Sequence, residues 1–190
     1  SRPYEIWTFN TDYKTNIGKG IDLKFGAKYA RANTESFFKN LATDEIIDAG
    51  ELNSENKVHY NENILAAYSS LNGKLKHFSF DLGLRLESFD YKLRAVLTDE
   101  QIKNNYLNLF PNFNIRYDFE DLKNSIALSG NRRIERPGYS MLNPFAVNNN
   151  PIYFTNGNTH LKPYFTNRLD LQYSHKWNSN HSLIFSLYGN

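Results

Sequence analysis

A strict alternation of apolar and polar side chains runs through Phe78-Ser79-Phe80-Asp81-Leu82-Gly83-Leu84-Arg85-Leu86. Successive side chains of a β-strand point to opposite faces, so one face of this stretch is apolar throughout and the other is polar. The same period of two recurs within residues 20–34, 106–119 and 165–176. The sequence therefore predicts a protein built of two-faced strands.

Eight segments of this kind can be marked along the chain, and no segment has a convincing helical period. They lie near residues 4–13, 20–34, 57–71, 76–90, 106–119, 124–135, 165–176 and 181–189. A tilted strand needs ~10 residues to cross the hydrocarbon of an outer membrane, whereas strands of soluble proteins are nearer ~5–6. The lengths favour an all-β fold: an antiparallel transmembrane β-barrel segment of about eight long strands in an up-and-down meander.

The predicted connections alternate between short turns and long loops, which is the asymmetry of outer-membrane barrels. Short turns are expected near 14–19, 72–74, 120–123 and 177–180, and long loops near 36–56, 92–105 and 136–164. Asn72-Gly73 is a strong signal for a tight hairpin turn, because both residues tolerate positive φ. Aromatic residues near strand ends, among them Phe89, Tyr91 and Tyr106 at the outer rim, suggest interfacial girdles, although aromatic residues are favoured in any β-sheet.

Composition excludes several classes of protein. The formal net charge is +2, and Lys and Arg are scattered among Asp and Glu, which leaves no basic patch for nucleic acid. There is no cysteine, which rules out disulfides and thiolate metal sites. No apolar run approaches the ~18 residues of a membrane helix. The chain opens at Ser1-Arg2-Pro3 without the pattern of a signal peptide, and we expect a piece cut from a longer protein.

The polar face of the predicted strands carries charges of both signs. Such a face belongs on the water-filled or protein-filled lumen of a barrel, or on the solvated side of an ordinary antiparallel sheet. The residues that we assign to the lumen are Arg85, Arg116, Arg133, Arg168 and Asp170.

The loop over 136–164 is the best candidate for contacts with a ligand. Its aromatic side chains offer stacking surfaces, and its asparagines offer hydrogen bonds that fix a polar ligand. The residues chosen are Tyr139, Phe145, Tyr153, Phe154 and His160. Packing of the loop over a barrel mouth would use the same aromatic residues. Arg132, Arg133 and Arg136 would bind an anionic ligand or lipopolysaccharide, or pair with carboxylates of the lumen.

Metal and catalytic signals are weak. The five histidines show no His-x-x-x-His spacing, and the acidic residues of loop 36–56 lack the spacing of a calcium loop. His160 with Asp99 or Ser140 is a pair of the kind that any loop-rich protein offers. We therefore expect no metal site, no cofactor and no enzyme.

Four stretches of the chain follow one another in the order and at the spacing of a known family. They are residues 108–117, 125–131, 132–145 and 157–170, and they resemble the barrel of TonB-dependent outer-membrane receptors, in particular the outer-membrane β-barrel family common in Bacteroidetes. The resemblance is most specific over 106–190 and rests on the strand pattern over 1–105. Thr159 and Tyr164 stand where the family more typically has Pro and Glu.

The resemblance implies that residues 1–190 form one segment, toward the C-terminal half, of a barrel of about 22 strands in the bacterial outer membrane. An N-terminal plug, absent here, would fill that barrel, and TonB would power it. The expected partners are outer-membrane lipid, the plug domain, TonB and a bulky nutrient such as an iron chelate, a cobalamin or an oligosaccharide. The alternative is a self-contained eight-stranded β-barrel or sandwich that binds ligands or partners without energy-coupled transport; a closed barrel needs complementary first and last strands.

Overall fold

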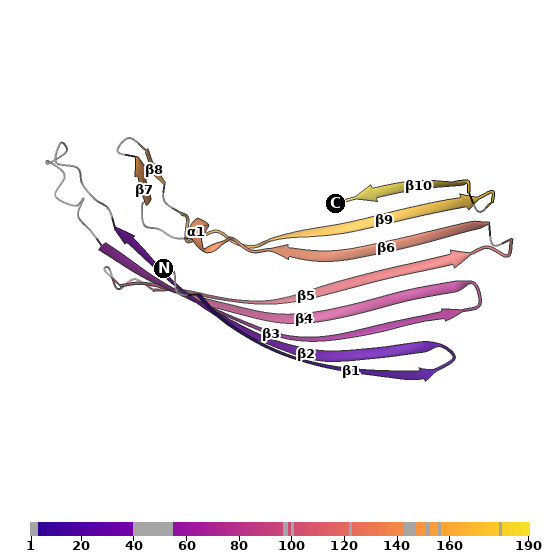
Figure 1. Ribbon diagram of the computed structural model, residues 1–190, viewed down its shortest axis with the longest axis horizontal. Helices are drawn as coiled ribbons and strands as arrows, with labels where there is room; N and C mark the ends of the chain where they lie inside the picture. Colours follow the sequence, from indigo (N-terminus) through magenta and orange to yellow (C-terminus); the bar gives the residue numbers. More distant parts are fainter. Residues whose placement is uncertain are drawn as a thin grey trace.

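One eight-stranded antiparallel sheet dominates the computed structural model, and each strand lies beside the next one along the chain (Figure 1). The structure describes residues 4–39, 55–96, 99, 101–121, 123–142, 147–150, 153–155, 157–178 and 180–190. The strands of the sheet, in spatial order, are β1 (Tyr4–Gly18), β2 (Ile21–Lys39), β3 (Glu55–Leu75), β4 (Phe78–Ala95), β5 (Gln101–Asp118), β6 (Asn124–Glu135), β9 (Tyr164–Lys176) and β10 (Ser182–Gly189). This arrangement confirms the predicted up-and-down meander.

The connection from β6 to β9 contains the only elements outside the main sheet within the described residues. They are a short helix, α1 (Tyr139–Leu142), and a two-stranded hairpin of β7 (Val147–Asn150) and β8 (Tyr153–Thr155). In Figure 1 these elements lie at one end of the sheet, opposite the end that holds the tight turns. We call these two ends the loop end and the turn end. Among the described residues, no helix has the length and apolar character to cross a membrane.

The sheet is open in the part of the chain that the structure describes. β1 pairs only with β2 and β10 only with β9, so the two edge strands do not meet (Figure 1). An unpaired edge presents a row of free backbone donors and acceptors, for which hydrocarbon offers no partner. The eight strands therefore do not form the closed sheet that a self-contained barrel requires.

The strands are longer than the sequence pattern predicts, and β4 and β5 show why. They stay paired up to Arg94 and Gln101, which leaves a connection of 96–100 in place of the long loop expected over 92–105. That loop prediction is wrong, because polar residues such as Lys92, Arg94 and Lys103 lie on one face of paired strands. The loop expected over 36–56 contracts to 40–54, which lies outside the described residues.

The turn predicted at Asn72-Gly73 is also wrong. Both residues lie inside β3, and the chain reverses at Lys76-His77, where Lys76 has a φ of 52°. A turn at 72–73 would place Leu82 opposite Asn63 on β3, whereas the observed register places Leu82 opposite Leu71. Register is fixed by matching apolar side chains on one face, and this outweighs the local turn preference.

Replacing Lys76 with glycine should stabilise the protein slightly. A non-glycine residue at positive φ is strained, and glycine relieves that strain. Because glycine also makes the unfolded chain more flexible, the net gain in the free energy of unfolding should be about 1 kcal/mol or less. The measurement is the thermal midpoint of the full-length protein in detergent. Lys74→Gly, inside β3, is the control and should lower the midpoint, because glycine weakens a strand interior. Equal shifts for the two variants would contradict the assigned turn.

The two faces of the sheet exchange character along the strands. Near the turn end, the face that carries Leu82 and Leu86 is apolar and solvent-exposed, and we call it the apolar face. The opposite face, which carries Arg85, is the polar face. Beyond Leu86, β4 reverses this pattern: Asp90 lies on the apolar face, and Phe89 lies buried on the polar face. β3 and β5 reverse at the same level, because Asn63 and Asn105 are in register with Asp90.

A buried cluster results where the polar face becomes apolar. Its members, the inner cluster, are Val58, Tyr60, Phe89, Tyr91, Leu93 and Leu142. The rings of Tyr60 and Tyr91 lie 5.8 Å apart, and Phe89 stacks on Tyr106 at 6.3 Å. Phe89, Tyr91 and Tyr106 therefore do not form the outer-rim girdle predicted for them, since they lie on the opposite face. The aromatic residues of the apolar face near this level are Trp7, Phe9 and Tyr29.

Candidate functional site

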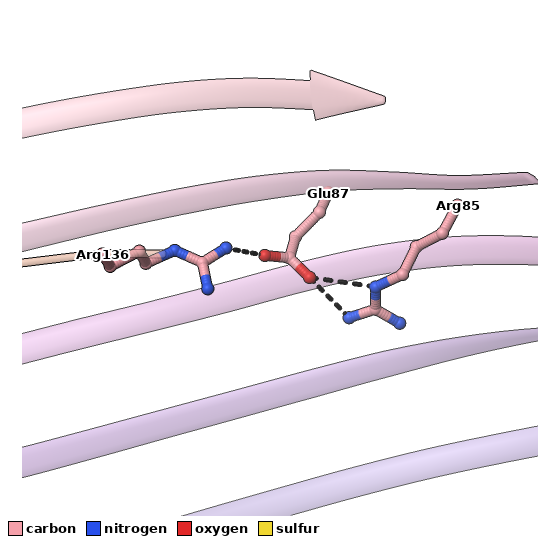
Figure 2. Close-up of polar contacts among 3 residues, drawn as sticks. All are labelled: Arg85, Glu87 and Arg136. Atoms are coloured by element: carbon pink, nitrogen blue, oxygen red, sulfur yellow. Dashed lines mark hydrogen bonds and ion pairs between the residues drawn. The ribbon is translucent and has the colours of Figure 1, made fainter. Parts of the chain in front are cut away.

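Glu87 lies between two arginines at the edge of the inner cluster (Figure 2). Only 6% of the residue is exposed. Arg85 donates two hydrogen bonds to Oε2 of Glu87, from Nε at 2.9 Å and from Nη2 at 2.7 Å. Arg136 donates from Nη2 to the other carboxylate oxygen. We call these three residues the Glu87 cluster. The two guanidinium groups give this buried carboxylate the hydrogen bonds that its burial requires.

Arg136 reaches Glu87 from a distant part of the chain. It follows β6, while Glu87 lies on β4, so the contact passes over β5. The guanidinium carbon also lies 4.5 Å from the centre of the Phe89 ring, a cation–π contact. The side chain of Arg136 is thus held by both a charge and a ring of β4.

Residues 136–142, which we call the return segment, are fixed at a second point. Leu142 in α1 is 2% exposed and packs in the inner cluster. The backbone nitrogen of Asn158 donates to the carbonyl of Met141 at 2.7 Å, which ties the later part of the loop to α1. Arg136 and Leu142 together place the return segment against the polar face of the sheet at the loop end.

Two buried side-chain nitrogens, one within the Glu87 cluster and one beside it, lack hydrogen-bond partners among the described residues. Nε of Arg136 and Nδ2 of Asn108 are buried and have no hydrogen-bond partner among the described residues. Asn108 is in register with Glu87 on the neighbouring strand. An unpaired buried donor is costly, so a water or a ligand acceptor at this position would be favourable. The site therefore combines aromatic surfaces with free donors, the combination expected of a polar-ligand site.

The structure places the predicted loop residues in different parts of the β6–β9 connection. Tyr139 begins α1, while Tyr153 and Phe154 belong to β8. His160 is exposed, and its backbone nitrogen donates to the side chain of Asn158 at 2.9 Å. Phe145 lies outside the described residues. Binding of a ligand by these residues stays a prediction.

The five charged residues assigned to a lumen lie on one face of the sheet. Strand register puts Arg85, Arg116, Arg133, Arg168 and Asp170 on the polar face. Four of them take part in an ion pair within their own strand, and Arg85 pairs with Glu87 in this way. Arg116 lies 2.7 Å from Asp118, and Arg168 lies 3.6 Å from Asp170. Mutual pairing explains how so many charges share one surface.

A side chain also bridges three strands on this face. The hydroxyl of Tyr68 on β3 donates to Asp12 on β1 at 2.7 Å, passing over Gly26 on β2. The ammonium of Lys24 lies 3.1 Å from the same carboxylate. The missing side chain at Gly26 provides the space for the Tyr68 ring, which makes this glycine a packing position rather than a turn position.

Sequence reasoning did not identify the inner cluster or the Glu87 cluster. The signal was present as a change of parity. In β4 the apolar residues fall on even positions up to Leu86 and on odd positions from Phe89. The same change separates Tyr106 from Leu107 in β5. A strand whose apolar set changes parity must pass from one environment into another.

Metal binding has no support in the described part of the chain, where no three His, Cys, Asp or Glu side chains are grouped as ligands. The turn between β5 and β6 shows how an acidic residue is used structurally. Asp121 accepts a hydrogen bond from the backbone nitrogen of Lys123, and this bond lowers the pKa of the Asp121 carboxyl.

Comparison with protein-family models gives a match over residues 1–190 to a model described as the outer membrane protein beta-barrel family. Comparison with curated protein sequences gives no match. Among solved structures, the chain is similar to the ferric citrate transporter FecA in its unliganded form, with a TM-score of 0.70 and 12% identity. It is also similar to the siderophore receptor PiuA from Acinetobacter baumannii (TM-score 0.59, 15% identity) and the ferric yersiniabactin uptake receptor FyuA from Yersinia pestis (TM-score 0.55, 15% identity).

The matches cover a much larger share of this chain than of the solved proteins. Each alignment covers 98% of this chain but only 27% of FecA, 32% of PiuA and 28% of FyuA. The chain thus spans about a third or less of the solved proteins that it resembles. At these identities the likeness shows the fold: long antiparallel strands of an outer-membrane barrel.

Proposed function

The chain belongs to the outer membrane protein β-barrel family, and from that premise we propose that it forms part of the wall of a TonB-dependent receptor that imports a bulky nutrient. Family membership places it in the bacterial outer membrane. The solved proteins with the same fold include a ferric citrate transporter and a siderophore receptor. Among an iron chelate, a cobalamin and an oligosaccharide, this favours an iron chelate as the first cargo to test.

The orientation follows from the connections. Outer-membrane barrels have short periplasmic turns and longer external loops. The Lys76-His77 turn therefore faces the periplasm, and the return segment faces the outside. Lipid contacts the apolar face, and the polar face, with Arg85, Arg116, Arg133, Arg168 and Asp170, lines the lumen.

The observation that carries the proposal is the return segment. An external loop folds inward onto the lumenal face, where Arg136 and Leu142 hold it beside free donors and aromatic rings. A surface of this kind, at the outer mouth of a wide barrel, is suited to bind a polar cargo before transport. The predicted ligand residues Tyr139, Phe145, Tyr153, Phe154 and His160 belong to the continuation of the same loop.

We further propose that residues 1–190 are one segment of a larger barrel whose lumen holds a plug that contacts TonB. The open edges of β1 and β10 support this, because in hydrocarbon each edge needs a further strand. The self-contained eight-stranded barrel or sandwich is less well supported, since the described strands form one open sheet. We propose no catalytic step and no cofactor.

Uptake by the full-length receptor in its own host tests the function. Labelled ferric citrate, a ferric siderophore, cobalamin and an oligosaccharide are offered to cells with and without the gene, each with and without a protonophore. We expect one cargo to enter only when the gene is present and the inner membrane is energised. A variant that lacks residues 140–160 should bind this cargo about tenfold or more weakly, because hot-spot contacts are concentrated in few residues.

Barrel assembly is the control for the loop deletion. The shortened protein should still show the heat-dependent electrophoretic mobility of a folded barrel. Uptake that ignores the protonophore would indicate a passive pore and would reject energy coupling. Unchanged cargo affinity in the folded deletion variant would instead reject only the assignment of the loop.

A further inference from the structure

A groove lies on the apolar face at the level where that face becomes polar. It has a volume of about 530 Å³ and spans β2 to β5, so neither edge strand, β1 or β10, contributes to its lining. The lining residues whose side chains share this face are Arg31, Asn61, Asn63, Asp90, Lys92, Lys103 and Asn105. Tyr91 and Asn104 also line the groove, although their side chains lie on the opposite face, where Asn104 donates to the Tyr91 hydroxyl. We call it the rim groove. The neighbouring row toward the turn end is largely apolar and includes Tyr29, Leu65 and Leu107. The groove therefore lies next to the edge of the lipid-facing band, on the outside of the wall.

Positive charge dominates the rim groove. Lys92 and Lys103 are register partners on adjacent strands, and like charges directly opposite one another are destabilising. Arg31 adds a third cation, and Asp90 is the one carboxylate in the lining. The Asp90 carboxylate accepts a hydrogen bond from Nδ2 of Asn63 at 2.8 Å. Within the described residues, none of the three cations forms an ion pair.

The charges farther from the lipid-facing band are arranged differently. Lys57 lies 3.0 Å from Glu35, and Arg94 lies 2.8 Å from Asp99. Ion pairing is thus the rule on the same face beyond the groove. On this face, among the side chains that the structure describes, the lysines without an ion pair lie at the level at which lipid headgroups would meet the wall. An anion from the membrane would relieve their repulsion.

We propose that the rim groove binds the phosphorylated headgroup of an outer-leaflet glycolipid. Lys92, Lys103 and Arg31 would contact phosphate. The side-chain amides of Asn61, Asn63 and Asn105 would hydrogen-bond sugar hydroxyls. Acyl chains would continue along Tyr29, Leu65 and Leu107. Basic residues at a membrane surface attract anionic lipids in this way. The proposal depends on the family's location in the outer membrane and is independent of the cargo.

The test uses the full-length protein, delipidated in neutral detergent, and titration with bisphosphorylated lipid A followed by native mass spectrometry. The Lys92→Ser/Lys103→Ser double variant should bind lipid A about 30-fold more weakly. The matched control, Lys57→Ser/Arg94→Ser, removes two cations from the same face outside the groove and should change affinity less than about twofold. Without lipid, K92S/K103S should have a higher thermal midpoint than the parent, because the repulsion is gone.

Two further probes identify the source of the phosphate. Dephosphorylated lipid A should bind the parent and K92S/K103S equally weakly, and inorganic pyrophosphate should not compete with lipid A at millimolar concentration. Effective competition by pyrophosphate would overturn the assignment to a lipid in favour of a soluble anion. Equal affinity of the parent and K92S/K103S for lipid A would overturn the site itself.

Discussion

Glu87→Gln should free the return segment from the lumenal face. The substitution keeps the shape of the side chain but removes the charge that holds Arg85 and Arg136. Breaking a fully buried ion pair costs ~3–5 kcal/mol, but both guanidinium groups are about a quarter exposed, so we expect about 2 kcal/mol here. Amide exchange at Met141 and Leu142 should accelerate about 30-fold. Hydrogen–deuterium exchange of the full-length protein measures this directly.

Asp118→Asn is the matched control. Asp118 pairs with Arg116 two positions away on its own strand, as Glu87 pairs with Arg85, but no contact joins it to the return segment. Exchange at Met141 should therefore be unchanged in Asp118→Asn. Arg136→Leu should reproduce the effect of Glu87→Gln, and the double variant should show no further acceleration, because both changes break one contact. Additive effects would show that the two residues act separately.

Gly26→Ala should lower the stability of the whole barrel. A Cβ at this position would collide with the backbone carbonyl of Thr11 on β1 and would lie 2.7 Å from the hydroxyl of Tyr68. A backbone atom cannot rotate away as a side chain can, so β1 must move from β2. Overpacking of this kind costs about 1–3 kcal/mol. The thermal midpoint of the full-length protein, followed by loss of heat-modifiable mobility, should fall by several degrees.

Two comparisons separate the causes of this loss. Gly138→Ala is the neutral control, since a Cβ there meets nothing within 4 Å. Tyr68→Leu combined with Gly26→Ala removes the collision with the ring but keeps the collision with Thr11. We expect little recovery in the double variant. Full recovery would show that the tyrosine, not the strand spacing, requires the glycine.

Much of the fold is predictable from the sequence because lipid imposes a simple pattern. Residues 124–135 were predicted as a strand and form β6 with the same bounds. Alternation identifies such strands because each faces one apolar and one polar environment along most of its length. Turn positions are harder to predict from the sequence. Asn72-Gly73 favours a turn locally, but the register of β3 and β4 places the turn elsewhere.

The site was only partly predictable. Arg136 was expected to pair with a carboxylate, and it does, but its partner Glu87 lies 49 positions away and two strands across. Arg132, which looked equivalent, instead stacks on Phe165 with its guanidinium carbon 4.2 Å from the ring centre. Arg132 lies inside β6, whereas Arg136 lies beyond its last residue, where the chain turns onto the polar face, so the two arginines enter different environments. The return segment crosses β5 because Leu142 packs in the inner cluster. This contact joins residues far apart in the sequence, so no local sequence pattern predicts it.

The change of apolar parity within β3, β4 and β5 provides a depth scale for the protein. In the proposed orientation, each strand marks the outer surface of the membrane at the position where its apolar residues pass from one face to the other, as between Leu86 and Phe89. In any homologous chain the bilayer boundary could then be located, strand by strand, from the amino-acid sequence. The same marker would divide each strand into a portion that contacts lipid and a portion that packs beyond the membrane surface. In the first portion apolar substitutions should be tolerated on the apolar face, and in the second portion on the opposite face.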